Sequence, residues 1–279
     1  IHDNLFDLGG DSILIIQIVS RAREAGLKLT PNQLFDHQTV AALAEVASVV
    51  QPAVAASAEQ GLVEGPSPLT PMQAWFFAQR FADPHHFNQS VCLEVPAGDL
   101  DHSSAAAATQ ALLAHHDALR LCFEEAEGGW TAHYAPPGAE VPFDVVDLSG
   151  VPTDQRDTSL RDAVLVRQAS FDLSTGPLFH VTVFQLCDGG PSRLLFAAHH
   201  LAVDGVSWRI LLADFFTVYA QIGRGDPVEL PEKTTSYRSW ATQLAPMAAE
   251  LAGNMTSSPA EVYWYADHGG VGSLPTDHA

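Results

Sequence analysis

One stretch constrains the fold of this sequence more than any other. Residues 194–198 form an apolar run with the length of a buried strand, two histidines follow at 199 and 200, and an amphipathic helical pattern begins near residue 204. Because neighbouring side chains of a strand point to opposite faces, we expect His199 on one face and His200 on the other. The two rings should therefore have separate roles.

Three interpretations of this stretch are open from the residues alone. In the first, the histidines end a strand and Asp204 is the N-cap of a helix with Ser207 in its first turn. In the second, the histidines and the aspartate bind zinc, although their spacing does not bring both rings to one side. In the third, one neutral imidazole is a general base whose tautomer a neighbour fixes.

Composition narrows the class of protein. The 279 residues are 47% hydrophobic and 16% charged, with a formal net charge of −20, which predicts a globular acidic chain with ample material for a core. This acidity argues against nucleic acid and anionic membrane surfaces as partners. We also expect a segment of a longer polypeptide, because the sequence begins at Ile1 without an initiator methionine and stops at Ala279 without an obvious terminal element.

The cysteines and the apolar runs indicate the cellular compartment of the protein. Cys92, Cys122 and Cys187 fit neither a disulfide framework nor a zinc ribbon, and they suit a reducing compartment. No signal peptide opens the sequence, and no apolar run reaches transmembrane length. These features predict a cytoplasmic protein.

The first 49 residues have the pattern of a small helical bundle. A Gly-Gly turn precedes Asp11 and Ser12, either of which could cap a helix that runs to about Gly26. Further helix starts lie at Thr30 and Thr39. The stretch Gly-Gly-Asp-Ser-Ile resembles the attachment motif of peptidyl carrier proteins.

The carrier resemblance implies a modification. It covers residues 1–49, the C-terminal portion of a carrier whose first helix is missing, and it implies that a phosphopantetheinyl transferase attaches 4′-phosphopantetheine to Ser12. The position suits a phosphodiester because a helix N-terminus exposes amides and the positive end of the dipole. The plain alternative is that Ser12 is only an N-cap.

Residues 50–66 lack amphipathic order and are rich in small residues, so we predict an interdomain linker there. From residue 67 onward, helical patterns alternate with strands. Helices are predicted from Thr70, at 103–116 and at 158–169, and strands at 91–95, 121–123, 130–134, 179–186 and 194–200. This alternation predicts an α/β lobe with a mixed sheet.

The motif His-His-x-x-x-Asp-Gly at 199–205 resembles the active-site motif of the condensation-domain superfamily of nonribosomal peptide synthetases, which has a chloramphenicol-acetyltransferase-like fold. Residues 206–211, 68–77 and 86–90 look like the epimerization branch of that superfamily. The resemblance implies that residues 67–279 are the N-terminal lobe of an epimerization domain.

The resemblance also implies roles for residues. His200 would be the catalytic base, and no metal would be bound. His199 would be a packing partner and Gly205 would give the backbone room. Residues 115–120 match a superfamily motif whose arginine pairs with the aspartate of the His-His motif, so Arg120 would pair with Asp204 and orient the loop.

The implied activity is inversion, from L to D, of the Cα of an aminoacyl or peptidyl thioester tethered to the carrier. In the family the opposing acid is a glutamate of a second lobe, and the sequence ends before such a lobe. Neighbouring adenylation (upstream) and condensation (downstream) domains would be partners, and the amino acid carried is not revealed.

Two alternative functions stay open. One is a condensation domain that forms peptide bonds, and the other is a non-catalytic carrier with a docking lobe. Asp11 before Ser12, together with Ser207 and Trp208, favours epimerization over condensation.

Overall fold

The computed structural model describes residues 1–49, 58–98, 100–138, 140–187 and 190–253. It divides into an N-terminal unit of residues 1–58 and a C-terminal unit of residues 59–279. Positions 50–57 of the predicted linker and positions 254–279 of the predicted lobe lie outside the described residues. No helix among those described is long and apolar enough to cross a membrane.

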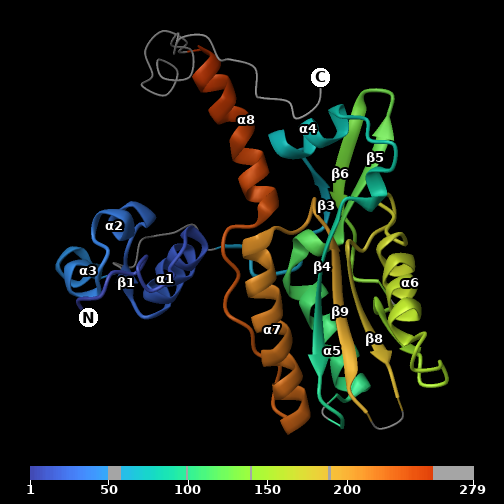
Figure 1. Cartoon of the computed structure of the whole chain (residues 1–279). Helices are drawn as coiled ribbons and strands as arrows, with labels where there is room; N and C mark the ends of the chain where they lie inside the picture. Colours follow the sequence, from blue (N-terminus) through green and yellow to red (C-terminus); the bar gives the residue numbers. More distant parts are fainter. Residues whose placement is uncertain (50–57, 99, 139, 188–189, 254–279) are drawn as a thin grey trace, which may run out of the picture. The chain divides into compact units, whose positions relative to one another are not determined.

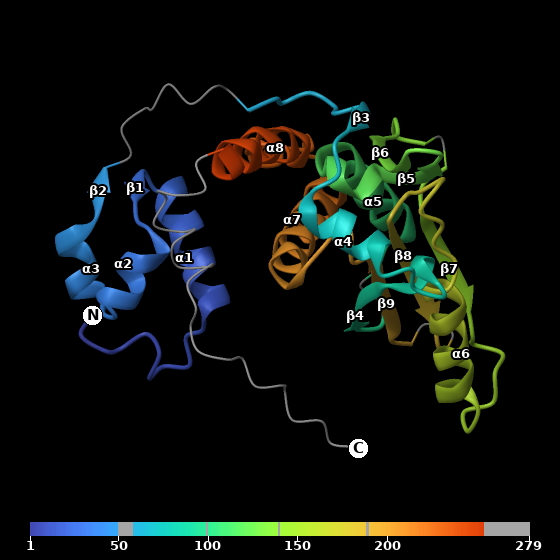
Figure 2. The same ribbon diagram turned by 90° about the horizontal axis from the view of Figure 1, so that it is seen from above.

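The N-terminal unit is a small helical bundle, as predicted. Its helices and short strands are α1 (Ser12–Glu24), β1 (Leu27–Lys28), α2 (Pro31–Asp36), α3 (Val40–Val46) and β2 (Ser48–Val49). The strands β1 and β2 pair antiparallel and lie side by side in Figure 2. Thr30 and Thr39 cap α2 and α3 through their side-chain oxygens, as the sequence predicts.

The C-terminal unit contains a mixed four-stranded sheet, which confirms the predicted α/β lobe. The sheet order is β4-β9-β8-β7, with β7 parallel to β8 and the other pairs antiparallel. Its strands are β4 (Asn88–Val95), β7 (Phe143–Asp147), β8 (Phe179–Gln185) and β9 (Ser192–His199). A second, antiparallel sheet has the order β3-β6-β5, with β3 (Gly65–Ser67), β5 (Leu121–Ala126) and β6 (Gly129–Tyr134).

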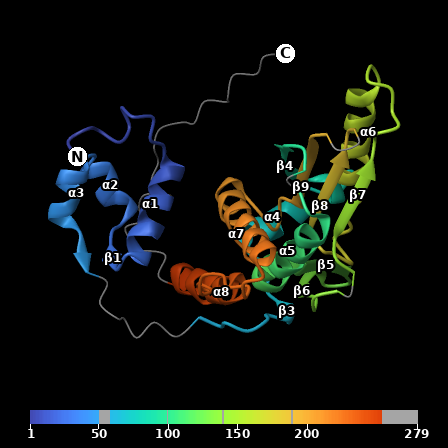
Figure 3. The same ribbon diagram turned by 90° about the horizontal axis from the view of Figure 1, so that it is seen from below.

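Helices cover both faces of the four-stranded sheet. The helices of this unit are α4 (Pro71–Ala78), α5 (His102–His115), α6 (Arg156–Gln168), α7 (Gly205–Arg224) and α8 (Tyr237–Gly253), with 3-10 turns η1 (Pro84–His86) and η2 (Asp117–Arg120). Of these, α5, α6 and α7 cover the four-stranded sheet. Figures 1 and 3 show α5 and α7 together on one side of the sheet and α6 on the other. This places the ends of the central strands between two helical layers.

The side chains of β9 alternate between the two layers. Phe196 and Ala198 belong to the core formed with α5 and α7, whereas Leu195 belongs to the core that α6 covers. The next residues in the same alternation are His199 and His200. The two histidines therefore leave the strand toward opposite faces, as the sequence predicts.

The C-terminal unit begins earlier than the predicted lobe, at residue 59 rather than 67. Val63 is fully buried, and its amide donates to a carboxylate oxygen of Asp117 at 3.1 Å. The Lys233 ammonium donates to the carbonyl of Gly61 and to Asp117, each at 2.9 Å. Residues 59–66 are thus bound to the folded unit, because their partners lie far away in sequence, and the predicted linker is too long at this end.

Candidate functional site

The candidate site lies where β9 ends at His199 and the chain turns into α7. The turn closes with a hydrogen bond from the amide of Ala202 to the carbonyl of His199, 3.0 Å. The amide of His200 donates to the carbonyl of Phe87 at 2.7 Å, which extends the pairing with β4 by one residue. Backbone hydrogen bonds therefore set the direction of both histidine side chains.

His199 is enclosed by the fold. It has no exposed surface, and its ring meets Phe76 edge-on with centroids 5.8 Å apart. The amide of Leu201 donates to Nδ1 at 3.2 Å, so the ring proton is on Nε2, which donates to the carbonyl of Pro84 at 2.8 Å. Burial lowers the pKa of His199 to about 4. Both nitrogens are engaged, as expected of a packing residue.

His200 has the opposite tautomer. Its Nδ1 lies 2.8 Å from the carbonyl oxygen of Val203, which can only accept, so the proton is on Nδ1. Its Nε2 lies 3.0 Å from the side-chain nitrogen of Gln89, and its ring stacks on Phe87 with centroids 5.1 Å apart. The ring is only partly buried. His200 is thus a neutral ring whose Nε2 lone pair faces the side-chain nitrogen of Gln89.

Asp204 is the N-cap of α7. Its carboxylate accepts from the amides of Val206 and Ser207 at 3.0 and 2.8 Å, and the Ser207 hydroxyl completes a capping box. Burial works to raise the pKa of Asp204, but the hydrogen bonds from Ser207 and Val206 and the nearby His200 outweigh it and lower the pKa. A Cβ built on Gly205 meets no atom within 4 Å, so the predicted need for backbone room there is wrong.

The predicted pair of Arg120 with Asp204 is also wrong. The Arg120 guanidinium is 2% exposed and pairs with Asp117, three residues earlier. Its other hydrogen bonds go to carbonyl oxygens of Leu113, Ala135 and Val63. The η2 turn brings Asp117 beside Arg120, and none of the hydrogen bonds of the guanidinium goes to Asp204. Arg120 therefore joins residue 63 to the end of α5 and to β6, and does not hold the loop.

Ser12 is exposed and is the first residue of α1. Asp11 provides the cap, because its carboxylate accepts from the amide of Leu14 at 2.7 Å. The preceding turn needs glycine, since a Cβ on Gly10 would lie 2.5 Å from the carbonyl oxygen of Leu5. An accessible hydroxyl at a helix N-terminus fits the attachment of a phosphopantetheine group.

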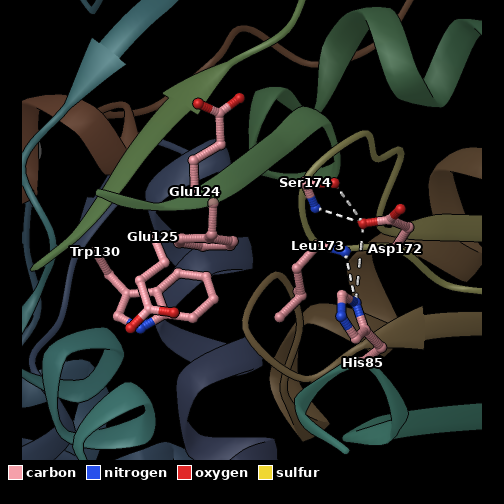
Figure 4. Close-up of a pocket in the computed structure, with 8 residues that line it drawn as sticks. His85, Glu124, Glu125, Trp130, Asp172, Leu173 and Ser174 are labelled. Atoms are coloured by element: carbon pink, nitrogen blue, oxygen red, sulfur yellow. Dashed lines mark hydrogen bonds and ion pairs between the residues drawn. The ribbon is translucent and has the colours of Figure 1, made fainter. Parts of the chain in front are cut away.

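A separate hollow of about 490 Å³ opens near the turn η1. Figure 4 shows His85 facing Asp172 and Leu173 on one side of it, with Glu124, Glu125 and Trp130 on the other. The Nδ1 of His85 accepts from the amide of Leu173 at 3.0 Å. Neither His199 nor His200 is among its lining residues.

One group of side chains in the described ranges could hold a metal ion: His115, His116 and Asp214, whose ligand atoms lie within 4.8 Å of one another. Nε2 of His116 is 2.8 Å from a carboxylate oxygen of Asp214, a contact that joins α5 to α7. Neither His199 nor His200 belongs to this group.

Gln89 and Trp208 were not predicted as site residues. The Trp208 indole donates to the side-chain oxygen of Gln89 at 2.9 Å, and Gln89 in turn contacts His200. Gln89 belongs to β4 and sits opposite Ala198 in the register of β4 with β9. The contact could have been predicted only by pairing the strand at 91–95 with the strand at 194–200 in the correct register.

Two family models cover most of the chain. A condensation-domain model matches residues 63–278, and a phosphopantetheine-attachment-site model matches residues 1–47. The chain is 51% identical over 244 residues, 88% of its length, to a linear gramicidin synthase of Brevibacillus parabrevis, of which this covers 5%. It is 44% identical over its whole length to a chondramide synthase of Chondromyces crocatus, of which it covers 7%.

Solved structures agree with the fold. The epimerization domain from the third module of tyrocidine synthetase B aligns with a TM-score of 0.68 and 38% identity, over 79% of this chain and 49% of that one. The first condensation domain of the calcium-dependent antibiotic synthetase aligns with a TM-score of 0.55 and 23% identity, over 67% of this chain and 44% of that one. The chain belongs to the condensation-domain family and is a segment of a nonribosomal peptide synthetase, in which a carrier segment with a phosphopantetheine attachment site precedes the condensation-family domain.

Proposed function

We propose that this segment serves epimerization: it inverts the Cα of an aminoacyl or peptidyl thioester carried on Ser12. The observation that carries the proposal is the likeness to the tyrocidine epimerization domain, at 38% identity and a TM-score of 0.68, against 23% and 0.55 for a condensation domain. The tautomer of His200 supports it, because the neutral ring presents a lone pair on Nε2.

In the proposed mechanism His200 is the general base. The tethering phosphopantetheine on Ser12 supplies a thioester, whose carbonyl makes the Cα proton more acidic than in an amide. Nε2 of His200 gives up its hydrogen bond from Gln89 and takes that proton, and the electron pair of the broken C–H bond moves into the enolate of the substrate. Throughout the reaction Nδ1–H of His200 donates a hydrogen bond to the carbonyl of Val203, and this bond stabilises the imidazolium that forms.

Inversion also requires a proton donor on the opposite face of the Cα. His199 is unsuitable, because it is buried on the other face of β9 and both of its ring nitrogens bond to the backbone. We propose that the donor is the glutamate of a second lobe that the family resemblance implies.

The alternative function is condensation, in which the same histidine positions an amine that attacks the thioester. The match of residues 63–278 to the condensation-domain model is compatible with both reactions. The proposed partners are the same in either case: the tethered thioester and the neighbouring domains of the synthetase.

The test uses the complete synthetase module loaded with an L-aminoacyl group on Ser12. Chiral analysis of the released amino acid in deuterium oxide should show D-product with deuterium at Cα. His200→Ala should abolish both inversion and exchange while leaving the loading of Ser12 unchanged, and His86→Ala, an exposed histidine of η1, should retain both. Peptide-bond product without exchange at Cα would refute epimerization and support condensation.

A further inference from the structure

The orientation of the Gln89 amide is fixed from one end. The Trp208 indole nitrogen can only donate, and it lies 2.9 Å from the side-chain oxygen of Gln89. The amide nitrogen must then be the atom that faces Nε2 of His200, 3.0 Å away. Because an amide nitrogen can only donate, Nε2 of His200 must accept. The Trp208 indole thus decides which atom of Gln89 faces His200, and hence that Gln89 donates and His200 accepts.

Two contacts therefore specify the same state of the His200 ring. The carbonyl of Val203 requires a proton on Nδ1, and the Gln89 amide requires a bare Nε2. The Val203 contact alone would permit a second protonation state, since a ring with both nitrogens protonated would also satisfy Val203. The Gln89 contact excludes that state, because it requires an Nε2 without a proton. Together they select the neutral ring with the lone pair on Nε2. We propose that Gln89, oriented by Trp208, is a positioning residue that keeps His200 in its neutral form, with Nε2 held without a proton by the Gln89 amide until the substrate takes its place.

The surroundings show that the contact is built into the fold. Trp208 is 7% exposed and lies in the first turn of α7, so its indole has a fixed position. Gln89 is held in the ladder of β4 with β9, opposite Ala198. Phe87 stacks on His200 with an interplanar angle of 16°. The strand, the helix and the aromatic ring thus constrain His200 from three directions.

Charged and titratable neighbours of the ring are few among the described residues. Asp204 faces His200 from the start of α7, and His199 precedes it on β9. His199 stays neutral above about pH 4, because burial lowers its pKa to about 4. Asp204 is engaged in capping α7 and is negative at neutral pH, because its pKa is lowered. Neither Asp204 nor His199 changes charge between about pH 6 and pH 9. A difference in the protonation of the His200 ring between variants of Gln89 in that range therefore reports on residue 89.

Two substitutions of similar shape separate polarity from packing. Gln89→Glu keeps an oxygen for the Trp208 indole but places an acceptor against Nε2. Since Val203 still requires a proton on Nδ1, the ring can satisfy both neighbours only with two protons. Gln89→Met keeps the length of the side chain and removes both polar contacts, so no carboxylate faces Nε2 to hold a second proton there. Gln243→Met, at an exposed position of α8, is the matched control.

The first experiment does not depend on catalysis. The whole chain is labelled with ¹⁵N-histidine, and the His200 resonances are identified by their loss in His200→Gln. At about pH 8 we expect one proton on Nδ1 in the unmodified chain and in Gln89→Met, and protons on both nitrogens in Gln89→Glu. A singly protonated ring in Gln89→Glu, or the same spectrum in the Glu and Met variants, would overturn the inference.

The second experiment rests on the proposed function and measures Cα deuterium exchange in the complete module. General-base catalysis contributes about 100-fold or more, so Gln89→Glu should lose about 100-fold in kcat near neutral pH and recover as the pH rises. Gln89→Met should lose less, and equally at every pH. Equal, pH-independent losses in both variants would show that Gln89 only packs. If the unmodified module exchanges nothing while the ¹⁵N pattern holds, epimerization fails and the role of Gln89 at His200 stands.

Discussion

Replacing His199 with glutamine should remove part of the pH dependence of stability in the C-terminal unit. The ring is fully buried, and burial lowers its pKa from 6.5 to about 4. Between these values the unfolded chain binds a proton that the folded chain does not. The contribution of His199 to the free energy of unfolding is therefore complete above about pH 6.5, and it is lost as the pH falls toward 4.

The size of the effect follows from the two pKa values. Their difference of 6.5 − 4 = 2.5 corresponds to about 3 kcal/mol at 1.36 kcal/mol per pH unit. Between pH 7.5 and pH 5 about 2 kcal/mol of this should disappear. His180, whose pKa is also lowered to about 4 by burial, acts in the same direction and remains in the variant. The lowered pKa of Asp101, from 3.8 to about 2, acts below this pH range.

The assay is urea unfolding followed by tryptophan fluorescence at pH 7.5 and pH 5. All five tryptophans lie at or after Trp75, so the signal reports on the C-terminal unit alone. The free energy of unfolding should fall by about 2 kcal/mol less in His199→Gln than in the unmodified chain. His86→Gln, at an exposed position, should keep the unmodified pH dependence. Identical pH dependence in His199→Gln and the unmodified chain would refute the reasoning.

Three further predictions follow from the contacts described above. Ser12→Ala should abolish the mass increase on incubation with coenzyme A and a phosphopantetheinyl transferase, and a remaining increase would place the attachment elsewhere. Arg120→Ala should cost roughly 3–5 kcal/mol, because it removes the buried guanidinium from its pair with Asp117 and from three carbonyl oxygens. Asp204→Ala should cost about 1 kcal/mol. Urea unfolding of the double variant should give the sum of the two losses, whereas strong coupling would restore the discarded pair. Lys233→Met should speed thermolysin cleavage within residues 59–64, and an unchanged cleavage rate would show that Lys233 does not hold this segment.

Features encoded by neighbouring residues could be predicted from the sequence. The helix start at Thr70 is one of these: Thr70 and Gln73 form a capping box at the start of α4, and Pro71 is its first residue. The alternation of β9 likewise placed His199 and His200 on opposite faces. In both cases the partners lie within a few residues of one another, so local rules decide the outcome.

Features that depend on contacts between segments far apart in the sequence could not be predicted. The contact of Gln89 with His200 spans 111 residues and exists only in the observed register of β4 with β9. The partner of Arg120 was misassigned for a related reason. The return of residues 59–66 across η2 buries the guanidinium beside Asp117, and no local pattern marks where a chain segment from another part of the sequence will pack.

The binding of residues 59–64 to the C-terminal unit also decides where mechanical load would be borne. The side chain of Gln60 exchanges two hydrogen bonds of 2.9 Å with the backbone of Lys233, and Arg238 pairs with Glu59 at 3.0 Å. A pull on the chain at residue 58 therefore meets these contacts before any force reaches α4. Residues 59–64 thus anchor the start of the C-terminal unit mechanically, ahead of the helix that packs against His199.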